Sequence, residues 1–304
     1  MKVPNAVTVV EVGPRDGLQN EPVPVPLAAK RELVHGLDAA GCPRLEVGAF
    51  VSPERVPQMA ATGELLAALG TLQARASVLV PNARGLEAAL GADVPEIAVF
   101  AAASETFSRA NTNGSIDTVT RRLEPVIAAA EARGRFVRVY VSCATHCPFE
   151  GPVAPAAVAT LAERLMAAGG DELALGETTG RATPRETRAV IDAVAVGVPR
   201  DRLAWHGHDT YGQALVNVLA ALEAEVTVVD AAVAGLGGCP FAPGAAGNLA
   251  TEDLVHLLDG LGVRTGIDLD RLVAAGRAIT TVLGHPPAGR VARALQPSGG
   301  AGSG

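Results

Sequence analysis

The chain has 304 residues, of which 48% are hydrophobic but only 3% are aromatic, so alanine, valine and leucine must supply most of a buried core. Its formal net charge of −7 argues against binding to nucleic acid or to an anionic membrane surface. No apolar run approaches the roughly 20 residues that a membrane-spanning helix needs, and the first residues show no signal-peptide pattern. These features predict a cytoplasmic protein whose four cysteines are free thiols.

Short runs rich in valine and isoleucine alternate along the chain with longer stretches whose apolar residues recur at helical spacing. The runs predict strands at residues 8–16, 44–50, 76–81, 96–103, 136–143, 172–179, 202–209 and 227–234. Between them, Leu33 and Leu37 lie on one face of the first predicted helix, and Leu161 and Leu165 on one face of a later helix. A glycine-rich loop, residues 235–248, follows the eighth strand.

Eight strand–helix units predict a closed parallel (β/α)8 barrel, the TIM barrel, with extra C-terminal helices. The alternative is an open Rossmann-like sheet, but no predicted strand is followed by a Gly-x-Gly-x-x-Gly turn. We expect one catalytic barrel over residues 1–297, including a helical extension from about residue 250. Residues 298–304 are expected to form a disordered tail.

In such a barrel, side chains at the carboxyl ends of the strands face one active site. Many of the polar residues are predicted to lie at these ends or just beyond them. They are Arg15, Asp16, Glu46, Cys143, His146, Cys147, Glu177, Thr178, His206, His208, Cys239 and Asn248. Because they come from positions spread over most of the chain, their convergence at one mouth is the main argument for a site.

His206 and His208 are two positions apart on a predicted strand, so both imidazoles project into the barrel while Trp205 points toward the helices. A single histidine there is more often a core residue, but a pair at the end of a barrel strand favours metal ligation. Asp16 is the natural carboxylate partner, and Asn248 could add an amide oxygen. This mixed set of nitrogen and oxygen ligands suits Mg²⁺ or Mn²⁺ better than a closed thiolate zinc site.

Arg15 directly precedes Asp16, and two roles are open for it. It could form an ion pair at the barrel end, with Glu46 or Glu177 as partner. A guanidinium held in this way could also stabilise negative charge that develops on a substrate oxygen.

Cys239 lies within the glycine-rich loop, where it could be buried and inert or could be an acid/base group carried by a lid. Sequence spacing alone does not distinguish between these two roles of Cys239. Cys143 and Cys147 are interpreted as structural, and the role of His146 is left open.

Several segments closely resemble the 3-hydroxy-3-methylglutaryl-CoA lyase family, within the larger group of metal-dependent barrel lyases and acyl-CoA condensing synthases. They are residues 11–20, 50–53, 56–59, 141–143, 147–151, 206–214, 235–240 and 247–253. The resemblance extends from about residue 7 to 290. Its most specific element is the loop sequence Gly-Leu-Gly-Gly-Cys-Pro, whose cysteine the condensing synthases typically lack.

The resemblance implies roles for individual residues. The metal ligands would be Asp16, His206, His208 and Asn248. Arg15 would lie at the thioester carbonyl, Cys239 would be the loop acid/base with His206 as proton shuttle, Glu46 and Glu177 would be carboxylates at the site, and Gln19 and Thr178 would contact the substrate.

The activity implied is divalent-metal-dependent cleavage of (S)-3-hydroxy-3-methylglutaryl-CoA to acetoacetate and acetyl-CoA, as in leucine degradation, by a homo-oligomer and most simply a dimer. Some positions depart from the family pattern: Glu177 replaces a usual aspartate, Ala49 and Ala174 stand where serine is common, and His146 replaces a small residue. The acyl specificity is therefore open. Alternatives are a lyase for a longer-chain (isohexenyl) thioester, a related aldolase or condensing synthase, and an inactive barrel that binds a metabolite.

Overall fold

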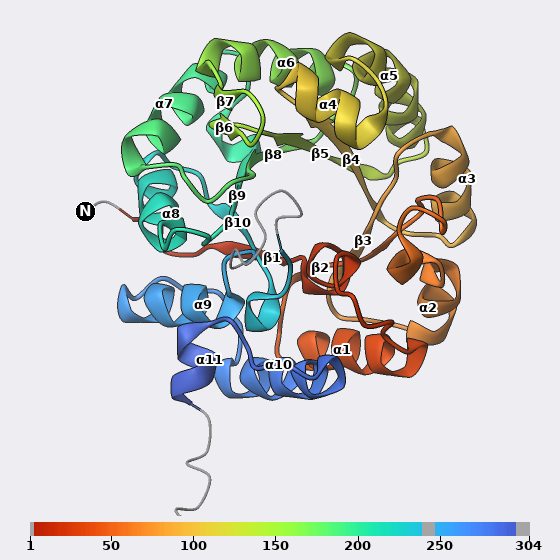
Figure 1. The fold of residues 1–304 in the computed structure, drawn as a ribbon, viewed down its shortest axis with the longest axis vertical. Coiled ribbons are helices and arrows are strands. Elements are labelled where there is room, and N and C mark those ends of the chain that lie inside the picture. Colours follow the sequence, from red (N-terminus) through yellow and green to blue (C-terminus); the bar gives the residue numbers. More distant parts are fainter. Residues whose placement is uncertain (1–2, 239–246, 296–304) are drawn as a thin grey trace, which may run out of the picture.

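The computed structural model describes residues 3–238 and 247–295. Eight parallel strands close into a barrel in the order β1-β10-β9-β8-β5-β4-β3-β2 (Figure 1). They are β1 (Thr8–Glu11), β2 (Arg44–Ala49), β3 (Arg75–Leu79), β4 (Glu96–Ala102), β5 (Phe136–Ser142), β8 (Glu172–Glu177), β9 (Leu203–Gly207) and β10 (Val228–Ala231). Each overlaps one of the eight predicted strands, so the TIM barrel is confirmed and the open sheet is excluded.

Helices surround the strands as a ring in Figure 1. They are α1 (Leu27–Ala39), α2 (Thr62–Leu69), α3 (Ala83–Gly91), α4 (Glu105–Thr112), α5 (Ile116–Ala132), α6 (Pro155–Ala167), α7 (Pro184–Val194), α8 (Ala214–Glu223), α9 (Thr251–Gly260), α10 (Leu269–Leu283) and α11 (Arg290–Ala294). Helices α9 and α10 lie between α8 and α1, with α10 packed along α1, so the expected extra C-terminal helices complete the ring. Among the described helices, none is both long and apolar enough to cross a bilayer.

Local sequence explains where several helices begin. Ser104 and Ser115 accept hydrogen bonds from the amides of Phe107 and Thr118, and so cap α4 and α5. Thr183 and Glu186 form a capping box at the start of α7. A small antiparallel hairpin, β6 (His146–Cys147) and β7 (Gly151–Pro152), lies in the loop after β5.

The amino-terminal end of the barrel is closed by buried, paired charges. Arg44 lies 2.6 Å from a carboxylate oxygen of Glu96 and 2.8 Å from one of Glu172. Glu172 also lies 2.9 Å from Arg138, whose side chain is only 1% exposed. Buried charges are tolerated only when they are paired, as these are. Because the paired side chains fill the amino-terminal end, the open end of the barrel is the carboxyl-terminal one.

The first strand is shorter than predicted. It ends at Glu11 rather than near residue 16, and residues Gly13–Gly17 form a single turn of π-helix. The Glu11 carboxylate accepts hydrogen bonds from the amides of Gly13 and Val233, at 2.8 and 2.9 Å, which turns the chain away from the sheet. Pro14 has no amide hydrogen for a strand ladder. Arg15 and Asp16 therefore lie in a turn above β1, and not on the strand.

Candidate active site

Three of the predicted metal ligands meet at the carboxyl end of the barrel. Ligand atoms of Asp16, His206 and His208 all lie within 4.8 Å of one another. Asp16 comes from the turn after β1, and the histidines come from β9 and the residue after it. Strand β10 pairs with both β1 and β9, which explains why residues so distant in sequence become neighbours.

Each histidine is oriented by a partner on its Nδ1 atom. His206 Nδ1 lies 3.0 Å from the Asp230 carboxylate, and His208 Nδ1 lies 2.6 Å from the backbone oxygen of Glu177. A carboxylate and a carbonyl can only accept, so each Nδ1 donates its proton. The lone pair of each neutral ring therefore resides on Nε2, as metal ligation requires.

Asn248 supplies the strongest sign that a cation fits here. Its amide nitrogen donates to Asp16, at 2.8 Å, and to the backbone oxygen of Leu236, at 3.1 Å. Its Oδ1 atom is buried and has no hydrogen-bond partner among the described residues. A buried oxygen without a donor is unfavourable unless a cation binds it. Asp16, His206, His208 and Asn248 together therefore fit a divalent ion.

Arg15 is held by two carboxylates. Nη1 lies 2.6 Å from Asp16 and Nη2 lies 2.6 Å from Glu46, while Nε is buried without a partner among the described residues. Burial lowers the pKa of Arg15, but Glu46 and Asp16 outweigh this effect and raise it above its ordinary value. The guanidinium is thus a permanent, fixed cation beside the candidate metal position, and of the two predicted partners only Glu46 binds it.

The charge state of Asp16 suits a metal ligand. Burial alone would raise its pKa, but the positive charge of Arg15 and the neighbouring imidazoles of His206 and His208 lower it to about 2. The carboxylate is therefore ionised at neutral pH. By contrast, burial raises the pKa of Glu46 above its ordinary value in spite of Arg15.

Glu177 and Thr178 lie at the end of β8. The carboxylate of Glu177 accepts from the Thr179 hydroxyl, at 2.9 Å, and from the Gly180 amide, at 2.6 Å. Thr178 Oγ1 accepts from the Cys143 amide at 2.8 Å. Both side chains thus hold the loop whose Glu177 carbonyl orients His208. Contact between Arg15 and Glu177, which the sequence left open, does not occur.

The other predicted residues have distinct surroundings. Gln19 donates to Asp16 at 3.3 Å, which places it at the metal side of the mouth. Cys143 and Cys147 are buried, and burial raises the pKa of Cys143, as expected for structural cysteines. His146 Nε2 lies 3.5 Å from Glu186. Cys239 lies outside the described residues.

Sequence reasoning missed three residues that support the site. Asp230 orients His206, Arg138 lies 2.6 Å from Asp230, and the Tyr140 hydroxyl lies 3.4 Å from Glu46. The signal was present, because a charged residue in the middle of an otherwise apolar barrel strand must have a buried partner. These residues lie within the strands and not beyond their carboxyl ends, where most of the predicted site residues are.

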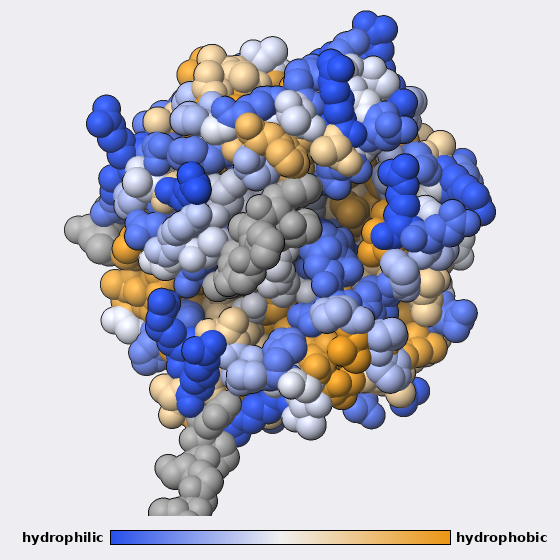
Figure 2. Space-filling view, viewed as in Figure 1, coloured by the Kyte–Doolittle hydropathy of each residue, from blue (hydrophilic) through white to orange (hydrophobic). Residues whose placement is uncertain are grey.

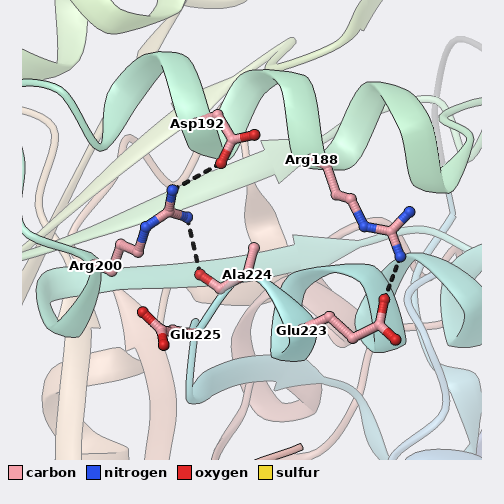
Figure 3. Close-up of a pocket in the computed structure, with 6 residues that line it drawn as sticks. All are labelled: Arg188, Asp192, Arg200, Glu223, Ala224 and Glu225. Atoms are coloured by element: carbon pink, nitrogen blue, oxygen red, sulfur yellow. Dashed lines mark hydrogen bonds and ion pairs between the residues drawn. The ribbon is translucent and has the colours of Figure 1, made fainter. Parts of the chain in front are cut away.

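The mouth of the barrel and a depression on the outer helices are separate features of the surface. Figure 2 shows the face seen in Figure 1, where hydrophilic residues gather near the barrel axis. A depression of about 280 Å³ lies elsewhere, between α7 and α8 (Figure 3). Its arginines are already paired, Arg188 with Glu223 and Arg200 with Asp192. These pairs lie on the outer helices, near the start of β9, so the depression is not the active site.

Comparisons with known proteins cover nearly the whole chain. The HMGL-like family model matches residues 6–279. A 3-hydroxy-3-isohexenylglutaryl-CoA/hydroxy-methylglutaryl-CoA lyase from Pseudomonas aeruginosa is 50% identical over 299 residues, covering 97% of this chain and 99% of that protein.

Solved structures of HMG-CoA lyases also match this chain over nearly its whole length. A crystal structure of hydroxymethylglutaryl-CoA lyase from P. aeruginosa has a TM-score of 0.95 at 50% identity, covering 97% of this chain and 99% of the other. An HMG-CoA lyase from Acinetobacter baumannii, in complex with coenzyme A and 3-methylmalate, has a TM-score of 0.91 at 34% identity and covers 97% of each chain. Because the family model and these relatives match nearly its whole length, the chain belongs to the HMG-CoA lyase family.

Proposed function

We propose that this protein is a divalent-metal-dependent lyase that cleaves (S)-3-hydroxy-3-methylglutaryl-CoA to acetoacetate and acetyl-CoA. The observation that carries the proposal is the meeting of Asp16, His206 and His208 beside the Oδ1 atom of Asn248, which has no hydrogen-bond partner in the described part of the chain. The fixed cation Arg15 lies next to them. The names of the relatives point to the same reaction.

The reaction is a retro-Claisen cleavage. The tertiary hydroxyl of the substrate loses its proton and becomes the ketone of acetoacetate, while the bond between C2 and C3 breaks. Its electron pair moves to C2 and forms the enolate of acetyl-CoA, which then takes up a proton at C2. Mg²⁺ or Mn²⁺, when bound, would orient the hydroxyl and lower its pKa.

Arg15 has the geometry to stabilise the enolate. Its charge is permanent, and contacts with Asp16 and Glu46 fix the orientation of the guanidinium plane. Its buried Nε–H has no protein partner among the described residues and could donate to the thioester oxygen. Glu46 would position Arg15. Gln19 would contact the substrate on the side where its carboxylate lies.

Proton delivery to C2 is assigned to Cys239. The expected shuttle role of His206 is not kept, because Asp230 holds its Nδ1 and the proposed metal would hold its Nε2. Support comes from the residue that precedes Cys239. The backbone oxygen of Gly238 accepts a hydrogen bond at 3.3 Å from Asn20, which lies four residues after Asp16 in the chain. A loop that starts beside the metal ligands can present its next residue to the substrate. For Glu177 and Thr178 the contacts favour a role in holding the β8 loop and His208.

A second candidate substrate is a longer 3-hydroxy-3-alkylglutaryl-CoA of the isohexenyl type. It is favoured by the name of the 50% identical relative from P. aeruginosa, which includes both thioesters.

The test is acetyl-CoA release by enzyme first stripped of metal with EDTA. We expect release from the methylglutaryl thioester only after Mg²⁺ or Mn²⁺ is restored, and the isohexenyl thioester is assayed in parallel. Equal turnover with and without metal would contradict the proposed chemistry. A clear preference in kcat/KM for the longer thioester would favour the second candidate.

Two further proposals concern the oligomeric state and the cellular location. We propose a homodimer, to be tested by light scattering coupled to size-exclusion chromatography. We also propose a cytoplasmic location, which cell fractionation would test.

A further inference from the structure

His206 is held from the interior of the barrel by a carboxylate that does not face the substrate. Asp230, on β10, is directly beside His206 in the strand register, and its side chain is 0% exposed. The 3.0 Å contact from its Oδ2 to His206 Nδ1 is the only hydrogen bond to this ring among the described residues. The orientation and tautomer of the ring therefore depend on how this carboxylate is oriented.

Arg138, on β5, sets the orientation of Asp230. Its Nη2 donates to Asp230 Oδ1 at 2.6 Å, and its Nε lies 2.9 Å from Glu172 on β8. The side chain of Arg138 is 1% exposed, so water does not compete for these contacts. The planar guanidinium thus lies between two carboxylates, with a hydrogen bond to Asp230 and an ion pair with Glu172.

We propose that Asp230 and Arg138 are positioning residues: Asp230 keeps the proton of His206 on Nδ1 and directs Nε2 toward the metal, and Arg138 holds Asp230 in the orientation that does so. The inference rests on the metal site of the proposed function. To that site the inference adds a series of contacting buried side chains, which extends from the closed end of the barrel to the proposed metal ligand His206. Partners that orient a ligating histidine commonly change metal affinity about 10- to 100-fold when they are replaced.

Asp230→Asn tests the first link. The amide offers a single oxygen where the carboxylate uses two, one for Arg138 and one for His206. An NH₂ group that faces His206 Nδ1 would favour the opposite tautomer, which moves the lone pair away from the metal. We expect the Kd for Mn²⁺, measured on metal-free protein by titration calorimetry, to rise about 10- to 100-fold.

Arg138→Lys tests the second link, and Arg44→Lys is its matched control. Both arginines are buried, both bind Glu172 and a second carboxylate, and lysine keeps the charge but not the two-sided geometry. Only Arg138 contacts the partner of a metal ligand. We expect Arg138→Lys to weaken Mn²⁺ binding about tenfold or more, and Arg44→Lys to leave it within about twofold of the wild type.

Thermal unfolding of the metal-free variants shows whether each is folded. A folded Asp230→Asn or Arg138→Lys variant with wild-type Mn²⁺ affinity would overturn the proposal. Equal weakening by Arg44→Lys would do the same, because it would indicate general loosening of the barrel interior. Wild-type protein that binds Mn²⁺ but releases no acetyl-CoA would refute the proposed function and leave this inference standing.

Discussion

Arg15 shows how one side chain acquires a function from its contacts. Asp16 and Glu46 bind its two terminal nitrogens at 2.6 Å each, so the guanidinium cannot turn away from the candidate metal position. Glu46, 31 positions farther along the chain, reaches Arg15 because β2 pairs with β1 in the folded barrel. The charge becomes useful for catalysis because it is held before the substrate arrives.

Arg15→Gln should lower kcat by about two to four powers of ten, with a modest change in KM, because a donor that acts on the developing enolate is removed. Steady-state acetyl-CoA release measures both constants. Arg188→Gln, which breaks an ion pair on the outer surface, is the matched control and should keep near-normal kcat. Near-normal turnover of the Arg15 variant would exclude the assigned role.

Cys239→Ser should lower kcat by a similar factor, since a hydroxyl is a far weaker acid than a thiol. A thiol alkylating reagent should inactivate the native enzyme, and substrate should slow the inactivation. Burial raises the pKa of Cys42 and Cys143, so these thiols should react slowly at neutral pH. Peptide mapping by mass spectrometry identifies the modified residue, and inactivation that follows labelling of Cys143 would contradict the assignment.

At the scale of elements, two buried glutamates hold the turn that follows β10. Glu11 accepts from the amide of Val233 at 2.9 Å, and Glu252 accepts from the amide of Ala234 at 2.9 Å. Ala234 has a φ of 59°, in the left-handed region that alanine rarely adopts. The two carboxylates thus stabilise a strained turn at the start of the glycine-rich loop.

These contacts predict a pH dependence of stability. Burial raises the pKa of Glu252 from 4.5 to about 8. The folded state therefore binds this proton more tightly than the unfolded state, so the stabilisation is fully present below about pH 4.5 and is lost as pH rises through 8. Burial raises the pKa of Glu11 to about 7, which acts in the same direction.

Glu252→Gln should therefore match the wild type in free energy of unfolding near pH 5 and exceed it near pH 8.5, by an amount on the order of 2–4 kcal/mol. Gln keeps an oxygen that can accept from the Ala234 amide, but it has no proton to lose. Urea unfolding at the two pH values measures the difference. An equal loss of stability at both values would contradict the shifted pKa.

At the scale of the whole molecule, the proposed metal ligands link distant parts of the chain. Asp16 and Asn248 lie 232 positions apart and come together at the mouth of the barrel. An ion bound by both, and by His206 and His208 at the end of β9, would stabilise only the folded state.

Mn²⁺ at about 100 times its Kd should add about 2.7 kcal/mol to the free energy of unfolding and raise the Tm by several degrees. EDTA should reverse the effect. The same titration with His208→Ala should produce a much smaller shift, because one ligand is missing. Differential scanning fluorimetry follows these changes, and an unchanged shift in the variant would place the ion elsewhere.

Much of the barrel and of its site could be predicted because both depend on local patterns. Eight apolar runs separated by helical periodicity indicated eight strands, and the His-x-His pair indicated two ligands on one face. The end of β1 was predicted wrongly, because the turn at Gly13–Gly17 depends on the contact between Glu11 and the amide of Val233, 222 positions away.

By itself, the sequence determined the order of strands and helices, the resemblance to a lyase family and the set of residues able to bind a metal. These follow from side-chain periodicity and residue type, which are properties of neighbours along the chain. Only the tertiary structure decided that Arg15 binds Glu46 and not Glu177, and that Asp230 and Arg138 support His206. It also decided that the Asn248 oxygen has no donor among residues 3–238 and 247–295. Such pairings depend on which strands become adjacent when the barrel closes, because buried charges and lone pairs are satisfied across the interior and not along the chain.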